Sequence, residues 1–140
     1  MRGLYEAIKL FPHRKIVHVL GACGGGRDAA RRPIFGKMVS EKADVVIVTN
    51  EDPYDDDPQE IINQVASGAR EAGKIENQNL FCILDRGEAI HKAINLAEPG
   101  DLVLITGKGS EPVMAVADGK TIPWDDREVA RSALRKKLVV

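Results

Sequence analysis

Lys108 and Glu111 are charged residues of opposite sign in the short glycine-rich tract Gly107-Lys-Gly-Ser-Glu111. The tract directly follows residues 101–106, an apolar-biased run that predicts a buried strand. In parallel α/β sheets, ligands bind in crevices at the carboxyl ends of the strands, and glycine lets the backbone approach a ligand closely. The tract therefore suits a ligand that carries an anion and an ammonium group together, as an amino acid does. An ordinary polar turn is the alternative.

Arginines are concentrated in a second glycine-rich segment, residues 21–32, which follows the predicted strand 15–21. A guanidinium group binds a carboxylate or a phosphate through two parallel hydrogen bonds. Arg27, Arg31 and Arg32 therefore suit an anionic group, and local pairing of Arg27 with Asp28 is the alternative. We predict Arg27 as a substrate-binding residue, and Arg31, Arg32 and Lys108 as candidate nucleotide or phosphate contacts.

The same segment contains Gly24-x-Gly26-x-x-Ala29, a pattern that satisfies the dinucleotide-binding fingerprint. An acid at the end of the next strand, Glu51 or Asp52, lies near the distance at which a ribose-binding acid is sought. The Arg27-Asp28 pair, however, stands where a helix should approach the pyrophosphate closely. A stand-alone dinucleotide-binding domain is therefore the second hypothesis.

Acidic residues dominate a third segment, Glu51-Asp-Pro-Tyr-Asp-Asp-Asp57, in which five of seven residues are acids. Asp57 precedes Pro58 and is expected to cap a helix. The remaining negative charge favours a cationic amine over magnesium, because no GxxxxGK[ST] phosphate-binding loop occurs in the chain. Tyr54 contributes a hydroxyl group, an aromatic wall, or only a cover for the loop.

Alternating strands and helices position these segments. The order predicts the α/β class, as a three-layer, Rossmann-like, mostly parallel sheet with a C-terminal edge hairpin around Asp118-Gly119. Parallel strands would bring the three segments to one edge of the sheet. We expect helices over residues 4–11, 34–41 (with Pro33 as the first helical residue), 58–72, 85–96 and 125–138, sheet strands over 15–21, 44–49, 80–84 and 101–106, and hairpin strands over 113–117 and 121–124.

The bulk composition narrows the class of protein. A length of 140 residues fits one domain, residues 1–140, and a net charge of −1 gives no general attraction to nucleic acid or to a membrane. Two cysteines suggest neither a disulfide framework nor a metal site, so a cytoplasmic location is expected. Cys23 and His18 lack an evident orienting acid, and we predict no catalytic residue and no metal site.

Taken together, the chain resembles the C-terminal domain of the Mur ligases, and among them the MurE type, over nearly its whole length. The stretches that carry the resemblance occur in the family's order: Cys23-Gly-Gly-Gly-Arg-Asp-Ala-Ala-Arg-Arg-Pro33, Ala43-Asp-Val-Val-Ile-Val-Thr49, Asp57-Pro-Gln-Glu-Ile-Ile62, Arg86-Gly-Glu-Ala-Ile90, Gly107-Lys-Gly-Ser-Glu111 and Asp126-Arg-Glu-Val-Ala-Arg131. The resemblance implies an ATP-dependent ligase of peptidoglycan biosynthesis, which adds the third amino acid to UDP-N-acetylmuramoyl-L-alanyl-D-glutamate.

The family's amino-acid pocket carries over by position. Its carboxylate-binding arginine corresponds to Arg27, and the Gly and Glu that hold the distal end of the amino acid correspond to Gly107 and Glu111. Its Asp-Asn-Pro-Arg motif corresponds to Glu51-Asp52-Pro53-Tyr54. Because Tyr54 replaces the arginine that binds a distal carboxylate, and Asp52 replaces the asparagine, we predict L-lysine or another diamino monoacid as the substrate.

The resemblance also implies which parts of the reaction lie elsewhere. The family's ATP-binding central domain and sugar-nucleotide-binding N-terminal domain have no counterpart in residues 1–140. We therefore expect ATP and Mg²⁺ to act in a full-length enzyme, with UDP-MurNAc-dipeptide as the other substrate and the central domain as a partner in cis. The chain alone should be inactive, and a non-catalytic binding module is a further alternative.

Overall fold

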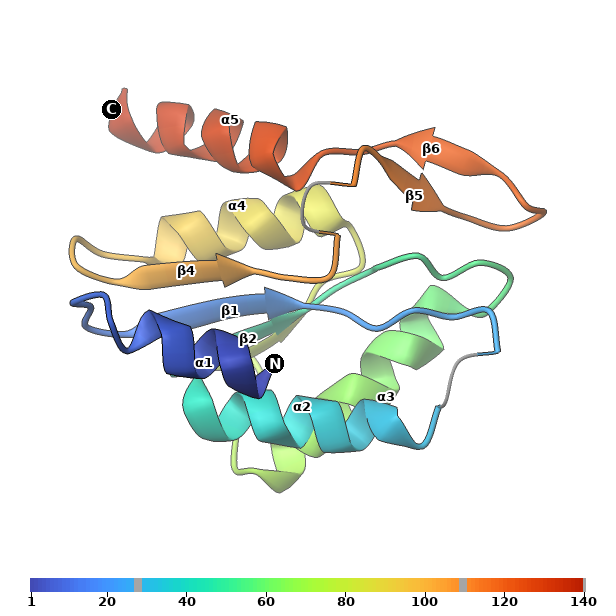
Figure 1. Cartoon of the computed structure of the whole chain (residues 1–140), viewed down its shortest axis with the longest axis horizontal. Coiled ribbons are helices and arrows are strands. Elements are labelled where there is room, and N and C mark those ends of the chain that lie inside the picture. The colour runs from blue at the N-terminus through green and yellow to red at the C-terminus, as the bar shows by residue number, and fades with distance from the viewer. Residues whose placement is uncertain (27–28, 109–110, 140) are drawn as a thin grey trace.

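The computed structural model describes residues 1–26, 29–108 and 111–139. Its centre is a four-stranded parallel sheet with the strand order β3-β2-β1-β4 (Figure 1). The strands are apolar runs rich in β-branched residues, as expected for strands buried on both faces. They are β1 (Ile16–Leu20), β2 (Val45–Val48), β3 (Leu80–Cys82) and β4 (Leu102–Ile105).

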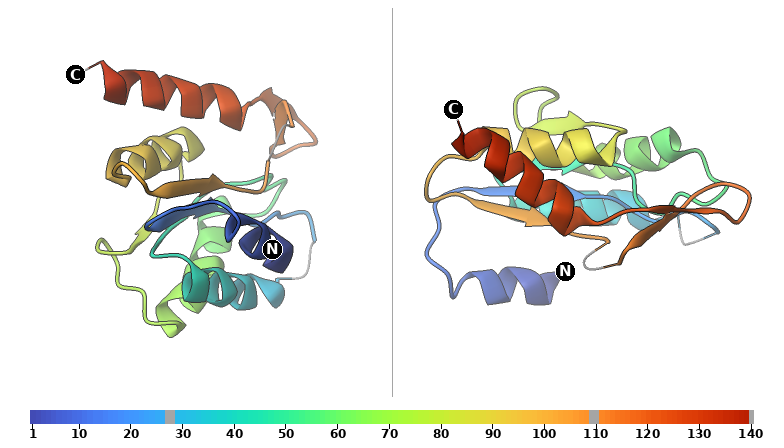
Figure 2. Two further views of the ribbon diagram at one scale, coloured as in Figure 1. Left: turned by 60° about the vertical axis from the view of Figure 1, so that its left-hand side comes forward. Right: turned by 90° about the horizontal axis from the view of Figure 1, so that it is seen from above.

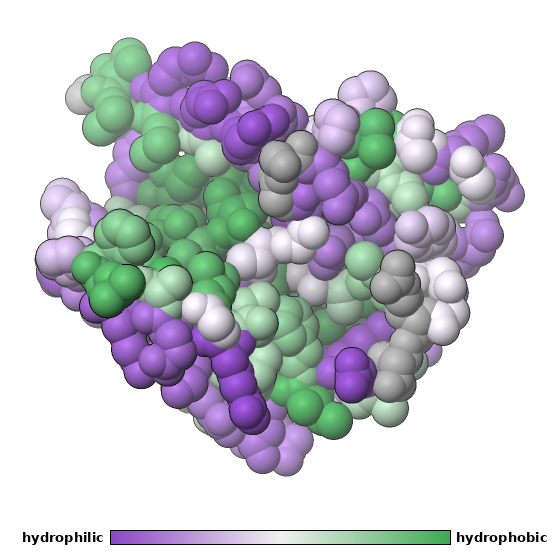
Figure 3. Space-filling view, in the orientation of Figure 1, coloured by the Kyte–Doolittle hydropathy of each residue, from purple (hydrophilic) through white to green (hydrophobic). Residues whose placement is uncertain are grey.

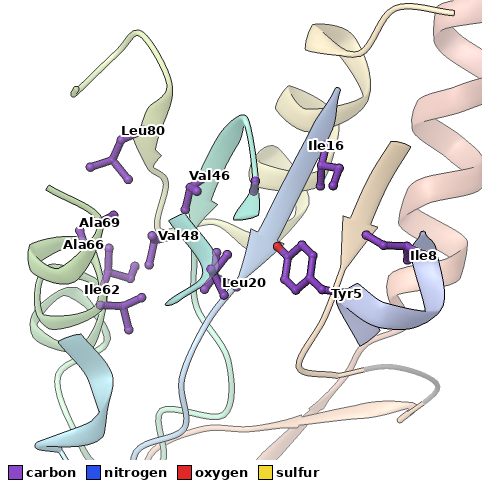
Figure 4. Packing of buried hydrophobic residues seen from close by; sticks show 13 residues of the cluster. Tyr5, Ile8, Ile16, Leu20, Val46, Val48, Ile62, Ala66, Ala69 and Leu80 are labelled. Atoms are coloured by element: carbon purple, nitrogen blue, oxygen red, sulfur yellow. The ribbon is translucent and has the colours of Figure 1, made fainter. Parts of the chain in front are cut away.

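Helices cover both faces of the sheet and complete three layers (Figures 1 and 2). One face packs against α1 (Arg2–Ile8), α2 (Arg31–Lys42) and α3 (Pro58–Glu71), and the other against α4 (Arg86–Leu96) and α5 (Asp126–Leu138). Figure 4 shows the hydrophobic core on the face covered by α1, α2 and α3, where Leu20 and Val48 of the sheet point toward Ile62 of α3. The predicted fold class is confirmed.

Aspartate caps begin three helices, one of them at Asp57 as predicted. The side chains of Asp57, Asp85 and Asp125 accept hydrogen bonds from backbone N–H groups in the first turns of α3, α4 and α5. Helix α2, in contrast, begins at Arg31 and not at Pro33. Proline is tolerated there because the N–H groups of the first helical turn have no intrahelical partner.

The predicted hairpin forms, with Asp118 and Gly119 both at positive φ in its turn. Its strands, β5 (Val113–Ala115) and β6 (Thr121–Pro123), pair with each other in a separate sheet and do not extend the edge of the main one. Figure 1 shows the hairpin beyond the carboxyl ends of the parallel strands. Hydrogen bonds to the acidic loop after β2, residues 51–57, hold it there: Ala115 N donates to Asp52 Oδ1 at 2.8 Å, and Asp118 N donates to Asp55 Oδ1 at 2.8 Å.

Strand β4 lies at the edge of the sheet, beside an apolar groove of about 450 Å³ between α4, β4 and α5. Figure 3 shows apolar side chains gathered in this region. Among the described helices, none has the length and apolar character required to cross a membrane.

Candidate functional site

The loops that follow β1, β2 and β4 meet at the carboxyl edge of the sheet, as predicted. Gly24 N donates a hydrogen bond to Asp52 O at 3.0 Å, and Cys23 Sγ lies 3.7 Å from Glu51 Oε1. Lys108 Nζ lies 2.8 Å from Asp52 Oδ1. The three segments therefore form one continuous surface.

Glycines let these loops approach one another. A Cβ atom at Gly24 would lie 2.0 Å from Pro53 O, and one at Gly107 would lie 2.6 Å from Glu51 Cδ. Gly107 also has a φ of +109°, a conformation that residues with a side chain rarely adopt. Packing between loops thus explains Gly24 without a bound pyrophosphate, which removes one support of the dinucleotide hypothesis.

Lys108 is the buried centre of a charge cluster. Its side chain is only 1% exposed, and Nζ donates to both carboxylate oxygens of Asp52 at 2.8 Å and to Glu111 Oε2 at 2.8 Å. Burial alone would lower the pKa of the Lys108 ammonium, but the hydrogen bonds to Asp52 and Glu111 raise it overall. Three acceptors match the three donors of an ammonium group. A phosphate at Lys108 would have to displace a carboxylate.

Two cavities divide the predicted site residues between them. The first, of about 440 Å³, is lined by Glu51, Gly107, Arg31 and Arg32 among others. Burial raises the pKa of the Glu51 carboxyl group there, and the nearby charge of Arg86 opposes this effect.

The second cavity, of about 290 Å³, lies between the loop after β2, the loop after β4 and the hairpin. Asp52, Tyr54, Lys108 and Glu111 line it, together with Lys120 of the hairpin, which was not predicted. The Tyr54 ring packs on the loop after β1, since a Cβ atom at Gly25 would lie 3.0 Å from Tyr54 Cδ2. This cavity unites two ammonium groups, two carboxylates and an aromatic ring around a space of amino-acid size.

The predicted arginines have different environments. Arg32 is 7% exposed and donates to Gln64 Oε1 at 2.6 Å and to Cys23 O at 3.1 Å. It therefore holds the loop after β1 against α3. Arg31 is exposed and lines the first cavity. Arg27 lies outside the described residues. Arg31 and Arg32 remain candidate phosphate contacts.

Arg86 and Asp126 form a buried ion pair directly behind the loops. Arg86 Nε and Nη2 donate to the two carboxylate oxygens of Asp126, each at 2.8 Å. Nη1 also donates to Asn50 O at 3.1 Å, and Nη2 donates to Thr106 O at 2.9 Å. Trp124 Nε1 donates to Asp126 Oδ1 at 2.7 Å. Both ion-pair residues lie in stretches that carry the family resemblance, but no feature of a single sequence indicates that they pair.

A second buried chain of hydrogen bonds joins α1 to the same edge. The Tyr5 hydroxyl lies 2.6 Å from His18 Nδ1, and His18 Nε2 lies 2.8 Å from Thr106 Oγ1. His18 has no exposed surface, and burial lowers its pKa to about 4. His18 is therefore a neutral core residue at physiological pH.

Comparison with known proteins identifies the family. A family model described as "Mur ligase, glutamate ligase domain" matches residues 1–109 of the 140. The chain belongs to this Mur ligase family.

Individual Mur ligases match nearly the whole chain. A UDP-N-acetylmuramoyl-L-alanyl-D-glutamate–2,6-diaminopimelate ligase of Syntrophomonas wolfei is 40% identical over 138 residues, which are 99% of this chain and 27% of that protein. A UDP-N-acetylmuramyl-tripeptide synthetase of Roseiflexus is 39% identical over 132 residues, 94% of this chain and 25% of that protein. A solved structure of a 2,6-diaminopimelate ligase of the same kind superimposes with a TM-score of 0.79 at 29% identity, covering 97% of this chain and 27% of that one.

The match confirms the resemblance to the MurE-type Mur ligases. The chain spans about a quarter of the length of the curated Mur ligases it matches. It therefore corresponds to one part of such a ligase. No group of three or more metal-ligating side chains suited to a metal ion occurs among the described residues of this Mur ligase domain.

Proposed function

We propose that this chain binds and orients the incoming amino acid in an amide-forming ligase of peptidoglycan biosynthesis, and that this amino acid is L-lysine or another diamino monocarboxylic acid. The Asp52–Lys108–Glu111 cluster beside Tyr54 is the observation that carries the proposal. The other substrate would be UDP-N-acetylmuramoyl-L-alanyl-D-glutamate, the compound in the names of the relatives.

Charge and exposure in the second cavity support an incoming amino acid whose side chain ends in a cationic group. Two carboxylates, Asp52 and Glu111, share the buried Lys108 ammonium, so this three-residue cluster carries one net negative charge. The Glu111 side chain is 60% exposed, in contrast to Lys108, so a ligand ammonium can reach its carboxylate from the cavity. Tyr54 adds no positive charge at the position where the family's arginine binds a distal carboxylate.

2,6-Diaminopimelate is a second candidate, because relatives are named as its ligases and because Lys120 lines the same cavity. An ammonium group on the hairpin is a suitable partner for a second carboxylate. The two candidates thus differ in which residue matters: Glu111 for a distal ammonium, Lys120 for a distal carboxylate.

The contribution of this chain to the reaction would be proximity. Side chains at the carboxyl edge of the sheet would hold the two ends of the amino acid and leave its α-amino group facing the acceptor, with Arg27 as the expected partner of the α-carboxylate. Fixing a nucleophile in this way removes much of the entropic cost of a bimolecular step. The family resemblance implies ATP and Mg²⁺, but the described residues form no complete site for either, since they include no metal-ligand group and the sequence has no GxxxxGK[ST] loop. We assign both to the remainder of a full-length ligase.

The test is an NMR titration of the chain with L-lysine, L-ornithine, 2,6-diaminopimelate and L-norleucine. L-Norleucine is the matched control, because it has the length of L-lysine but no distal ammonium. We expect saturable shifts at residues 51–54 and 107–108 with L-lysine, and weaker binding of L-norleucine. Glu111→Gln should weaken L-lysine binding by about tenfold or more, since a hydrogen bond to a charged group typically contributes about 1.5–3 kcal/mol.

Three results would count against the proposal. Tightest binding of 2,6-diaminopimelate, lost in Lys120→Ala and retained in Glu111→Gln, would favour the second candidate. Equal affinities for L-lysine and L-norleucine would remove the distal-ammonium argument. A response to NAD, with none to any amino acid, would favour a dinucleotide-binding function.

A further inference from the structure

The guanidinium group of Arg86 connects two strands that are not neighbours in the sheet. Strands β2 and β4 lie on either side of β1, so no sheet hydrogen bond joins them. Arg86 Nη1 donates to Asn50 O, just beyond β2, and Nη2 donates to Thr106 O, just beyond β4. One buried side chain therefore holds the exits of both strands.

Those two carbonyl groups directly precede the candidate site. Asn50 lies two residues before Asp52, and Thr106 lies two residues before Lys108. Asp52 and Lys108 are the two residues whose side chains meet at 2.8 Å. Any change in the spacing of the strand exits would change the separation of the two backbones that carry this ion pair.

Asp126 fixes the orientation of the guanidinium group. Its two oxygens accept from Nε and Nη2 at 2.8 Å, and Oδ1 also accepts from Trp124 Nε1. The Arg86 side chain is 1% exposed and the Asp126 side chain is 6% exposed. A planar fork can donate to a carboxylate and to two carbonyl groups at once, whereas the single nitrogen of a lysine cannot reproduce these directions.

We propose that Arg86, oriented by Asp126, is a positioning residue that holds the ends of β2 and β4 at the spacing required for the Asp52–Lys108 pair and for ligand binding between the two loops. The inference rests on the proposed function, because it treats Asp52 and Lys108 as ligand-site residues. Neither Arg86 nor Asp126 lines the second cavity, so the effect on the ligand is indirect.

The test compares Arg86→Lys and Asp126→Asn with the unchanged chain. Arg86→Lys keeps the positive charge and removes the fork. In the folded protein we expect altered amide resonances at residues 50–52 and 106–108, an altered Lys108 ammonium resonance, and L-lysine affinity reduced about tenfold or more. Trp124→Phe, which removes one hydrogen bond to Asp126, should give smaller shifts at the same residues, and it serves where the ion-pair variants do not fold.

Two controls separate positioning from general destabilisation. Arg131→Lys changes an exposed ion pair with Glu128 on α5 and should leave the loop resonances unchanged. Gly36→Ala should destabilise the fold at the distant α2–α3 contact and also leave the Lys108 resonance of the folded protein unchanged.

Two outcomes would overturn the inference. The first is an unchanged Lys108 resonance in every folded variant of Arg86, Asp126 and Trp124. The second is a changed resonance with unchanged L-lysine affinity. If the unchanged chain binds no amino acid, the proposed function fails. The Lys108 resonance of the variants then still tests whether Arg86 positions the two strand ends.

Discussion

At the scale of single residues, Gly107 and Glu51 share one small volume at the candidate site. The backbone of Gly107 lies against the carboxyl group of Glu51, whose side chain also lines the first cavity. Gly107 also has a positive φ. Both features favour glycine at this position. A single added methyl group would meet the Glu51 carboxyl group and would be strained at this positive φ.

Gly107→Ala should therefore destabilise the fold by about 2–5 kcal/mol, from steric overlap and backbone strain together. The new Cβ atom would lie 2.6 Å from Glu51 Cδ at a φ of +109°. Urea unfolding measures the change in free energy. Gly119→Ala is the control, because its φ is also positive but nothing lies within 4 Å of the new Cβ atom; its cost should be only about 1–2 kcal/mol. Equal costs for the two variants would contradict the steric argument.

At the scale of elements, α2 and α3 pack at unusually short range through two glycines. A Cβ atom at Gly36 would lie 1.9 Å from Val65 O, and one at Gly68 would lie 1.8 Å from Pro33 O. The overlap is with backbone atoms, which cannot rotate away. The two helices would have to separate along their whole contact.

Gly36→Ala should thus cost about 1–3 kcal/mol or more, although alanine has the higher helix propensity. Gly3→Ala on α1 is the matched control, since that position has nothing within 4 Å and should gain about 0.5–1 kcal/mol. Thermal unfolding of both variants gives the comparison. Stabilisation by Gly36→Ala would show that the helices can separate freely.

The elements were predictable to different degrees, for physical reasons. Aspartate caps and apolar periodicity are local signals, and they gave the helices and strands within a few residues. The place of the hairpin depends on hydrogen bonds to the acidic loop after β2, such as Ala115 N to Asp52 Oδ1. These are tertiary contacts without a local signal in the sequence. Proline at the start of α2 is compatible with several positions in the first turn, so it did not fix the first helical residue.

The candidate site shows the same division. Three loops could be assigned to one edge because parallel strands all end on the same side. Which side chains pair there could not be assigned, because Lys108 and Asp52 are 56 residues apart in sequence and Arg86 and Asp126 are 40 apart. Charge composition predicted attraction for a cation, but not that Lys108 already supplies one.

At the scale of the whole molecule, His18 links stability to pH. Its folded-state pKa of about 4 lies below the ordinary value of 6.5, so the fold favours the neutral imidazole. This contribution is fully present above pH 6.5 and is lost as the pH falls from 6.5 toward 4. The shift corresponds to about 3 kcal/mol.

His18→Gln should remove this part of the pH dependence. Between pH 6.5 and 4, the unfolding free energy of the variant should fall by about 3 kcal/mol less than that of the unchanged chain. Urea unfolding at several pH values measures the difference. His91→Gln on α4, outside the Tyr5–His18–Thr106 chain, is the control and should retain the full slope. Identical slopes for all three proteins would contradict a neutral, buried His18.

Trp124 is the only tryptophan among the 140 residues, and its indole N–H is bound to Asp126 within the Arg86 network. The chain thus carries a single indole fluorophore, directly behind the loops that form the candidate site. Its emission is not an average over several indoles, and it originates where α5, the hairpin and the two strand exits come together. A change in intensity or wavelength therefore reports on this junction specifically, and the protein needs no added label to signal a rearrangement of its own site.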